Sequence, residues 1–201
     1  TRVISCVAGK GGVGKTFCVA NLGVALSELG KDVIAMDANL TTPNLGIHLG
    51  VPLHPVTLHD VLKSDAKLHE AIHNHYSGLR VIPASISVKD LHNVNPRHLS
   101  NVVLDLLGNA DFVLLDSSAG LGKEALASLE ASDESLFIIN PNLPSAIDAL
   151  KAVKLAEQIG SKPIGVVVNR IKGYKHELSR MEIRNLLNLP ILAEIPESKH
   201  V

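Results

Sequence analysis

The residues best suited to chemistry lie near the start of the chain, at positions 9–16. They read Gly-Lys-Gly-Gly-Val-Gly-Lys-Thr and match the spacing G-x-x-x-x-G-K-[S/T]. Glycines let successive backbone N–H groups curl around an anion, and the N-terminus of a following helix adds partial positive charge. Lys15 is expected to reach the β- and γ-phosphates of a nucleotide, and the Thr16 hydroxyl to bind Mg²⁺. The residues predicted to surround the phosphates are Gly11, Gly12, Val13, Gly14, Lys15, Thr16 and Phe17.

Other candidate residues follow apolar segments elsewhere in the chain. Asp116 ends the segment 112–115, and a carboxylate at the carboxyl end of a strand beside a phosphate-binding loop is placed to hold Mg²⁺ through water. Asn169 and Arg170 follow the segment 164–168, where the amide could pair with the edge of adenine and Arg170 could flank it. A helix cap at Asp116 and a turn at Asn169 are the simpler alternatives.

The elements that must position these residues alternate along the chain. Short β-branched runs predict strands at 3–7, 33–36, 79–82, 112–115, 136–139, 164–168 and 191–193. They are continuously apolar, as in strands that helices cover on both faces. Helical periodicity predicts helices at 15–29, 96–107, 122–130, 145–159 and 177–187. We therefore expect an α/β fold of three layers, with a mainly parallel sheet and ligands outside the carboxyl ends of its strands.

Composition supports one folded domain over residues 1–201. The chain is 46% hydrophobic and 19% charged, which excludes disorder. Its net charge of −1 offers no broad basic face for duplex nucleic acid, and 2% aromatic content leaves few rings for unpaired bases. Cys6 and Cys18 lie in apolar segments, where we expect free buried thiols in a reducing, cytoplasmic setting.

A second lysine, Lys10, lies inside the phosphate-binding loop, where only small residues are needed. With this lysine, the loop resembles the deviant Walker A motif of the MinD/ParA ATPases, in which the extra lysine reaches the nucleotide of a partner subunit. The resemblance spans the whole chain and is greatest to MinD. The blocks that carry it are Asn21–Leu26, Pro43–Gly50, Asp116–Gly120, Asn140-Pro141, Val168–Arg170 and Ile195–Glu197.

The resemblance implies a P-loop ATPase that binds ATP or ADP with Mg²⁺. It adds Asp37 to Thr16 and Asp116 as residues that support the metal, and Pro196 to Asn169 and Arg170 as residues near adenine. It also implies a homodimer in the ATP-bound state, in which Lys10 contacts the partner's phosphates, and an activating protein partner. Slow hydrolysis would then drive a molecular switch in cell-division site placement or intracellular positioning.

The sequence departs from the family at three places. MinD-like proteins carry Asp-x-Asp after the second strand, and here the second position is Asn39, which can bind the attacking water but cannot accept its proton. Hydrolysis is therefore in question. Phe17 replaces the usual threonine, so only its backbone N–H can meet the α-phosphate. MinD chains also continue to a membrane-binding helix, and we expect peripheral membrane association only through such a C-terminal segment, which is not among residues 1–201.

Two alternative functions stay open at this level. One is a nucleotide-dependent binding or scaffold module with little hydrolysis. The other is a ParA-like ATPase that partitions DNA or cargo, because a small basic cluster occurs at Arg170, Lys172, Lys175, Arg180 and Arg184. An H-E-x-x-H match at residues 69–73 has the spacing of a zinc peptidase, but no third ligand follows at the spacing of that family. An iron–sulfur carrier would need paired cysteines near a dimer axis, whereas Cys6 and Cys18 lie in a predicted core strand and a predicted core helix.

Overall fold

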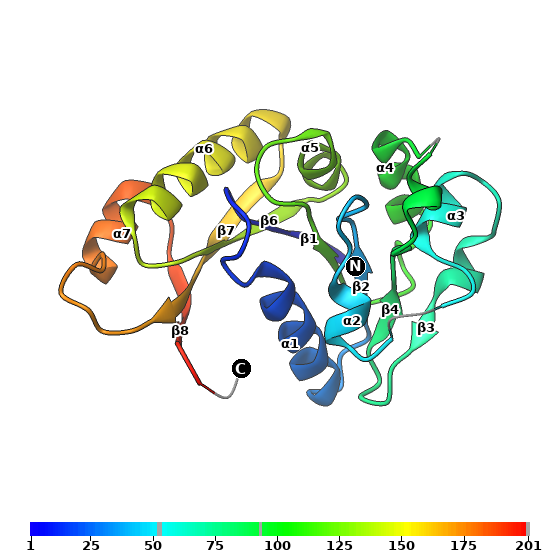
Figure 1. The fold of residues 1–201 in the computed structure, drawn as a ribbon, viewed down its shortest axis with the longest axis horizontal. Coiled ribbons are helices and arrows are strands. Elements are labelled where there is room, and N and C mark those ends of the chain that lie inside the picture. The colour runs from blue at the N-terminus through cyan, green and yellow to red at the C-terminus, as the bar shows by residue number, and fades with distance from the viewer. Residues whose placement is uncertain (52–53, 93, 200–201) are drawn as a thin grey trace.

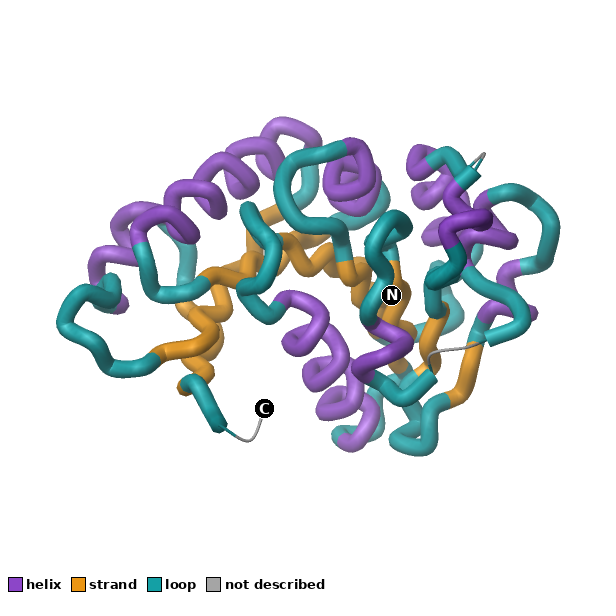
Figure 2. Tube along the Cα trace, in the orientation of Figure 1, coloured by secondary structure: helices purple, strands orange, loops and turns teal. Residues whose placement is uncertain are grey.

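The computed structural model describes residues 1–51, 54–92 and 94–199 (Figure 1). Within these ranges, eight strands form one sheet in the order β3-β4-β2-β5-β1-β6-β7-β8 (Figure 2). All neighbouring strands run parallel except β3, which pairs antiparallel with β4. The strands are β1 (Arg2–Val7), β2 (Val33–Asp37), β3 (His73–Asn74), β4 (Arg80–Ile82), β5 (Phe112–Asp116), β6 (Glu134–Ile139), β7 (Lys162–Ile171) and β8 (Ile191–Pro196).

Helices cover the sheet on both faces, which confirms the predicted three-layer α/β fold (Figure 1). The α-helices are α1 (Lys15–Glu28), α2 (Leu45–His48), α3 (Leu58–Leu62), α4 (Leu99–Leu104), α5 (Lys123–Glu130), α6 (Leu143–Ile159) and α7 (Arg180–Leu187), and the 3₁₀ helices are η1 (Leu68–Ala71), η2 (Val88–Leu91) and η3 (Pro96–His98). One face of the sheet packs against α1 and α2, and the other against α3, α4, α5, α6 and α7. This double cover explains why the central strands are apolar throughout.

Strand order determines where a ligand site forms. β1 lies between β5 and β6, and the chain crosses from one side of β1 to the other when it passes from β5 to β6. A crevice opens at such a switch point, outside the carboxyl ends of the strands. The phosphate-binding loop leaves β1 at this crevice and enters α1, which begins at Lys15.

Two predicted helices are shorter than expected, and each difference has a local cause. The helix expected at 96–107 begins as η3, where Asn95 Oδ1 accepts a hydrogen bond from the Arg97 N–H, and its regular part ends at Leu104. The helix expected at 177–187 begins at Arg180, because Ser179 caps it and Glu182 bonds back to the Ser179 N–H. Glu177 lies outside that helix and instead accepts from two backbone N–H groups of the preceding loop.

Three short elements of the described chain were missed in the sequence. α2 and the 3₁₀ helix η2 span only four residues each, and β3 only two, so none leaves a readable periodicity. Between β2 and β3 the chain also forms two further short helices, α3 and η1. Among the described residues, no helix is long and apolar enough to cross a membrane.

Phe137 tests the packing of the central sheet. It lies in β6, has no exposed surface, and belongs to the cluster that β6 and β7 form with α6 and α7. Phe137→Ala should lower the free energy of unfolding by about 3–5 kcal/mol, because it leaves a cavity that a close-packed core cannot fill. Leu29→Ala is the control, since Leu29 is 76% exposed. Chemical denaturation measures both, and equal effects would contradict this description of the core.

Candidate functional site

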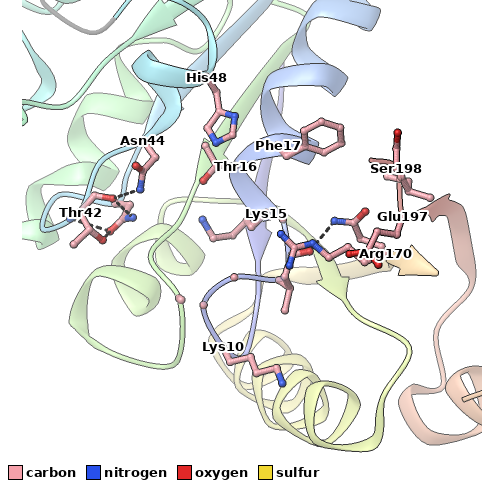
Figure 3. Close-up of a pocket in the computed structure, with 18 of the residues that line it drawn as sticks. Lys10, Lys15, Thr16, Phe17, Thr42, Asn44, His48, Arg170, Glu197 and Ser198 are labelled. Carbon is pink, nitrogen blue, oxygen red and sulfur yellow. Dashed lines mark hydrogen bonds between the residues drawn. The ribbon is translucent and has the colours of Figure 1, made fainter. Parts of the chain in front are cut away.

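The predicted phosphate-binding loop lines a pocket of about 900 Å³, a size suited to a small-molecule ligand (Figure 3). Its walls come from four regions: the loop with the start of α1, the segment after β2, the segment after β5, and the ends of β7 and β8. All of the predicted phosphate-binding residues line it, together with Lys10, Asn39, Asn169, Arg170 and Pro196. Strand order thus brings together residues that are far apart in the sequence.

Glycine is required in the loop by both conformation and packing. Gly12 and Gly14 have φ values of 79° and 94°, a left-handed conformation that other residues rarely adopt. A Cβ atom on Gly14 would also collide with the amide nitrogen of Asn169. That nitrogen donates a 2.8 Å hydrogen bond to the Val13 carbonyl oxygen. Asn169 therefore fastens the phosphate-binding loop to the end of β7, a contact that the sequence did not reveal.

A buried ion pair lies at the base of the pocket. Lys15 Nζ is 2.5 Å from Asp116 Oδ1, and the two side chains are 8% and 0% exposed. The other carboxylate oxygen, Asp116 Oδ2, is buried and has no hydrogen-bond partner in the structure. An unpaired buried carboxylate oxygen suits a hydrated Mg²⁺, a hard cation that prefers oxygen ligands, and the Thr16 hydroxyl lines the pocket next to Lys15, the partner of Asp116. Thr16 and Asp116 are therefore the residues here that would hold the metal.

Asp37 is the second buried carboxylate of the site. It and Asp116 are register partners at the carboxyl ends of the neighbouring strands β2 and β5. Burial, followed by the nearby charge of Asp116, raises the Asp37 pKa to about 8. Its oxygens accept from the backbone N–H groups of Asn39, Asn44 and Leu45 at 3.2, 2.9 and 2.9 Å. The carboxylate thus shapes the segment after β2, and its support of a metal stays a prediction.

Asn39 lies in the pocket wall with its side chain turned toward its own loop. Asn39 Nδ2 donates to the Thr42 carbonyl at 2.6 Å, and Asn39 Oδ1 accepts from Thr42 Oγ1 at 3.2 Å and from Thr42 N at 3.4 Å. Asn44 Nδ2 also donates to the Thr42 carbonyl. Figure 3 shows these hydrogen bonds on the side of the pocket away from Arg170. The amide that was predicted to orient water is therefore occupied by Thr42.

The opposite wall contains the residues predicted to lie near adenine. Asn169 is buried, while Arg170 is exposed and adopts a left-handed φ of 60°. The segment after β8 completes this wall with Pro196 and Glu197. Glu197 is held there by its N–H bond to the Ile171 carbonyl and by a 2.6 Å ion pair with Lys172.

Lys10 lies at the rim of the pocket and extends away from Lys15 (Figure 3). Gly9, beside it, packs so closely on α6 that a Cβ atom would lie 2.5 Å from Asp148. The first half of the loop therefore has a fixed backbone from which the Lys10 side chain projects outward.

Several pocket residues were not predicted individually. They are Thr42, Asn44, His48, Ala119, Ile195, Glu197 and Ser198. Most belong to blocks that resemble the MinD/ParA ATPases, which was the available signal. Among them, His48 is exposed and lies near Phe17 (Figure 3).

The competing sites find no support. His69 lies in η1 and His73 in β3, so the H-E-x-x-H match does not place two imidazoles on one helix face. In the described part of the chain, no group of three His, Cys, Asp or Glu residues could hold a metal ion. Cys6 and Cys18 are both buried and free, as expected, and burial raises the pKa of each thiol.

Comparison with known proteins agrees with this geometry. Residues 4–201 match the model of the CobQ/CobB/MinD/ParA nucleotide binding domain. An uncharacterized ATP-binding protein of Methanocaldococcus jannaschii is 36% identical over 198 residues, which are 98% of this chain and 75% of that protein.

Two solved structures are similar over almost the whole chain. The septum site-determining protein MinD of Pyrococcus horikoshii, complexed with Mg-ADP, is 36% identical with a TM-score of 0.95, over 98% of this chain and 82% of that one. The cell division ATPase MinD of Pyrococcus furiosus is 35% identical with a TM-score of 0.95, over 98% and 84%. The chain therefore belongs to the CobQ/CobB/MinD/ParA family of nucleotide-binding domains, among which it is similar to the MinD ATPases.

Proposed function

We propose that this chain is an ATP-dependent molecular switch that binds ATP with Mg²⁺, dimerises on ATP and hydrolyses it slowly to ADP and phosphate. The observation that carries the proposal is the glycine-rich loop, whose Lys15 meets a buried Asp116 at the base of a nucleotide-sized pocket. The Mg-ADP complex of the Pyrococcus horikoshii relative supports the choice of ligand. The similarity to MinD favours a role in cell-division site placement or intracellular positioning.

The phosphate end of the pocket supplies charge and oriented donors. The loop from Gly11 to Phe17 offers backbone N–H groups to the phosphates, and Lys15 offers an ammonium that is already desolvated. A bound Mg²⁺ would supply positive charge against the negative charge that develops on the phosphates. Thr16 and Asp116 would hold it, with Asp37 supporting the loop beside them.

The wall formed by the ends of β7 and β8, opposite Asn39, offers polar contacts to adenine. Asn169 Nδ2 donates its hydrogen bond to the Val13 carbonyl oxygen. The amide atom left for a ligand is therefore the acceptor Oδ1. A carbonyl oxygen there would accept from the exocyclic amino group of adenine. Arg170 and Pro196 line the same wall and would flank the ring.

Hydrolysis depends on how well water is positioned. Asn39 is in the pocket wall, and an asparagine orients water without removing its proton. Because phosphoryl transfer depends mostly on positioning and electrostatics, slow turnover remains compatible with this residue. The alternative, a binding module that does not turn over, differs from the switch only in this step.

Partner binding completes the proposed cycle. Lys10 projects from the pocket rim, away from Lys15, and this supports a contact in trans with the phosphates of a second copy. An activating protein partner would then accelerate the slow step. The DNA-partitioning alternative is less favoured, since Lys172 and Arg180 of the basic cluster are paired with Glu197 and Glu194.

Lys15 tests nucleotide binding. Lys15→Ala should abolish ATP binding, because it removes a charge-assisted contact to the triphosphate. Calorimetry measures the affinity, and circular dichroism checks folding, since Asp116 would lose its buried partner. Lys31→Ala is the matched control, because Lys31 is exposed beyond the end of α1. Unchanged ATP affinity in a folded Lys15→Ala protein would refute the assignment.

Asn39 tests hydrolysis. We expect the unmodified protein to turn over at below about one ATP per minute without a partner, and Asn39→Asp to raise the rate, because general-base assistance contributes ~10²–10⁴. Asn44→Asp is the control, since it adds the same charge to the same loop. Single-turnover hydrolysis of bound ATP measures all three proteins. A lower or equal rate in Asn39→Asp would mean that Asn39 does not position the water.

Lys10 tests the dimer. ATP, and not ADP, should convert the monomer to a dimer, and Lys10→Ala should abolish this conversion while leaving ATP binding to the monomer largely intact. The reason is that Lys10 would bind the phosphates of the second subunit, and removing it removes that contact between the subunits. A positive charge delivered in trans in this way acts like an arginine finger, which is worth ~10³–10⁵ in rate in systems that use one. Light scattering measures the assembly. A dimer that is indifferent to Lys10, or a monomer in both states, would contradict the proposal.

A further inference from the structure

Two loops at the phosphate end of the pocket are joined by a side-chain contact. Thr41 Oγ1 donates a 2.5 Å hydrogen bond to Glu124 Oε1, and the Thr41 N–H lies 3.5 Å from Glu124 Oε2. Thr41 is at the tip of the segment between β2 and α2, and Glu124 is in the first turn of α5. In Figure 1, the segment before α2 rises toward α5, in agreement with this contact.

The two joined segments both begin at the acidic strand ends. The first leaves β2 after Asp37, and the second leaves β5 after Asp116, which is its register partner. Near the strands, Ala38 N donates to the Asp116 carbonyl at 3.0 Å. Thr41 and Glu124 join the same two segments again, farther from the sheet. The segment 38–44 is therefore held at its base by Asp37 and at its tip by Glu124.

Asn39 lies between these two attachments. Its side-chain amide is used on both sides by Thr42, the residue next to Thr41. To turn the side-chain oxygen Oδ1 of Asn39 toward a water in the pocket, these hydrogen bonds would have to break and the segment would have to shift. The Thr41–Glu124 contact opposes that shift, because it anchors the tip of the segment to α5.

We propose that Thr41 and Glu124 form a latch that holds Asn39 turned away from the attacking water, so that both are positioning residues that restrain hydrolysis. The proposal rests on the proposed ATPase function. The latch suits a reversible role: a hydrogen bond from a hydroxyl to a carboxylate is charge-assisted, but Thr41 is exposed and Glu124 half-buried, so water can replace either partner. In GTPases, loops beside the phosphate site are ordered by the γ-phosphate and released on hydrolysis, so a contact that can open fits this place.

Amide hydrogen exchange tests the latch without any nucleotide. Glu124→Ala removes both acceptors, and the Thr41 and Thr42 amides should then exchange several-fold faster by NMR. The amides of Asn44 and Leu45 are the internal control, because Asp37 accepts from both of them and should still protect them. Glu130→Ala, at the exposed end of α5, should change neither pair. Unaltered exchange at Thr41 and Thr42 would overturn the latch.

Single-turnover hydrolysis tests its consequence. Thr41→Val and Glu124→Ala should each raise the rate of hydrolysis about three- to tenfold, the factor expected from one hydrogen bond, with ATP affinity within twofold of the unmodified protein. Thr41→Ser should stay near the unmodified rate, because it keeps the hydroxyl. The double variant should resemble the single ones, since both remove the same contact. An unchanged or lower rate in both single variants would overturn the restraint.

Dependence on Asn39 separates a positioning role from a merely structural one. In an Asn39→Ala background, Thr41→Val should leave the rate unchanged, because there is no amide to release. An equal gain in that background would overturn the proposal. If no variant hydrolyses ATP while the exchange result holds, the proposed ATPase function fails and the contact between the loops stands.

Discussion

The ion pair between Lys15 and Asp116 is the interaction on which the site depends. Both groups are almost completely withdrawn from water, and the loss of hydration is tolerable only because they neutralise each other. Removing one partner of such a pair typically costs about 3–5 kcal/mol. Asp37 is a further buried carboxyl group, opposite Asp116, and burial, followed by the nearby charge of Asp116, raises its pKa to about 8, which is an electrostatic strain on its ionised form. A further cation at this place would relieve that strain.

The sheet explains why these charges meet. β2, β5 and β1 are parallel neighbours, so their carboxyl ends open on one edge, and Asp37 and Asp116 are directly opposite each other. Helices on both faces exclude water from the strands that carry them. The same layers that stabilise the fold therefore keep water from the charged groups at the bottom of the open pocket. Electrostatic interactions are stronger in such a buried, low-dielectric environment than in water.

Local patterns in the sequence were sufficient to predict the structural elements that are determined by residues close together along the chain. The glycine-rich loop, the apolar strands and the long helices were all recognisable, because motif and periodicity extend over many positions. Asn39 shows where this fails: its position in the pocket was predicted, but its bonds to Thr42 were not, since a turn of four residues has no period. Contacts between distant segments, such as Asn169 with Val13, depend on the strand order and leave no trace along the chain.

The bond between Asn169 and the Val13 carbonyl has a consequence for how this sequence can vary. Gly14 faces the same amide at a distance that admits no side chain, and its left-handed backbone already disfavours one. Positions 14 and 169, which lie in the first and seventh strand–loop units, are therefore a single steric unit. A family member that enlarges one of them must shrink or reorient the other. Because Asn169 also lines the wall opposite Asn39, such a change would reshape the pocket at both of its ends.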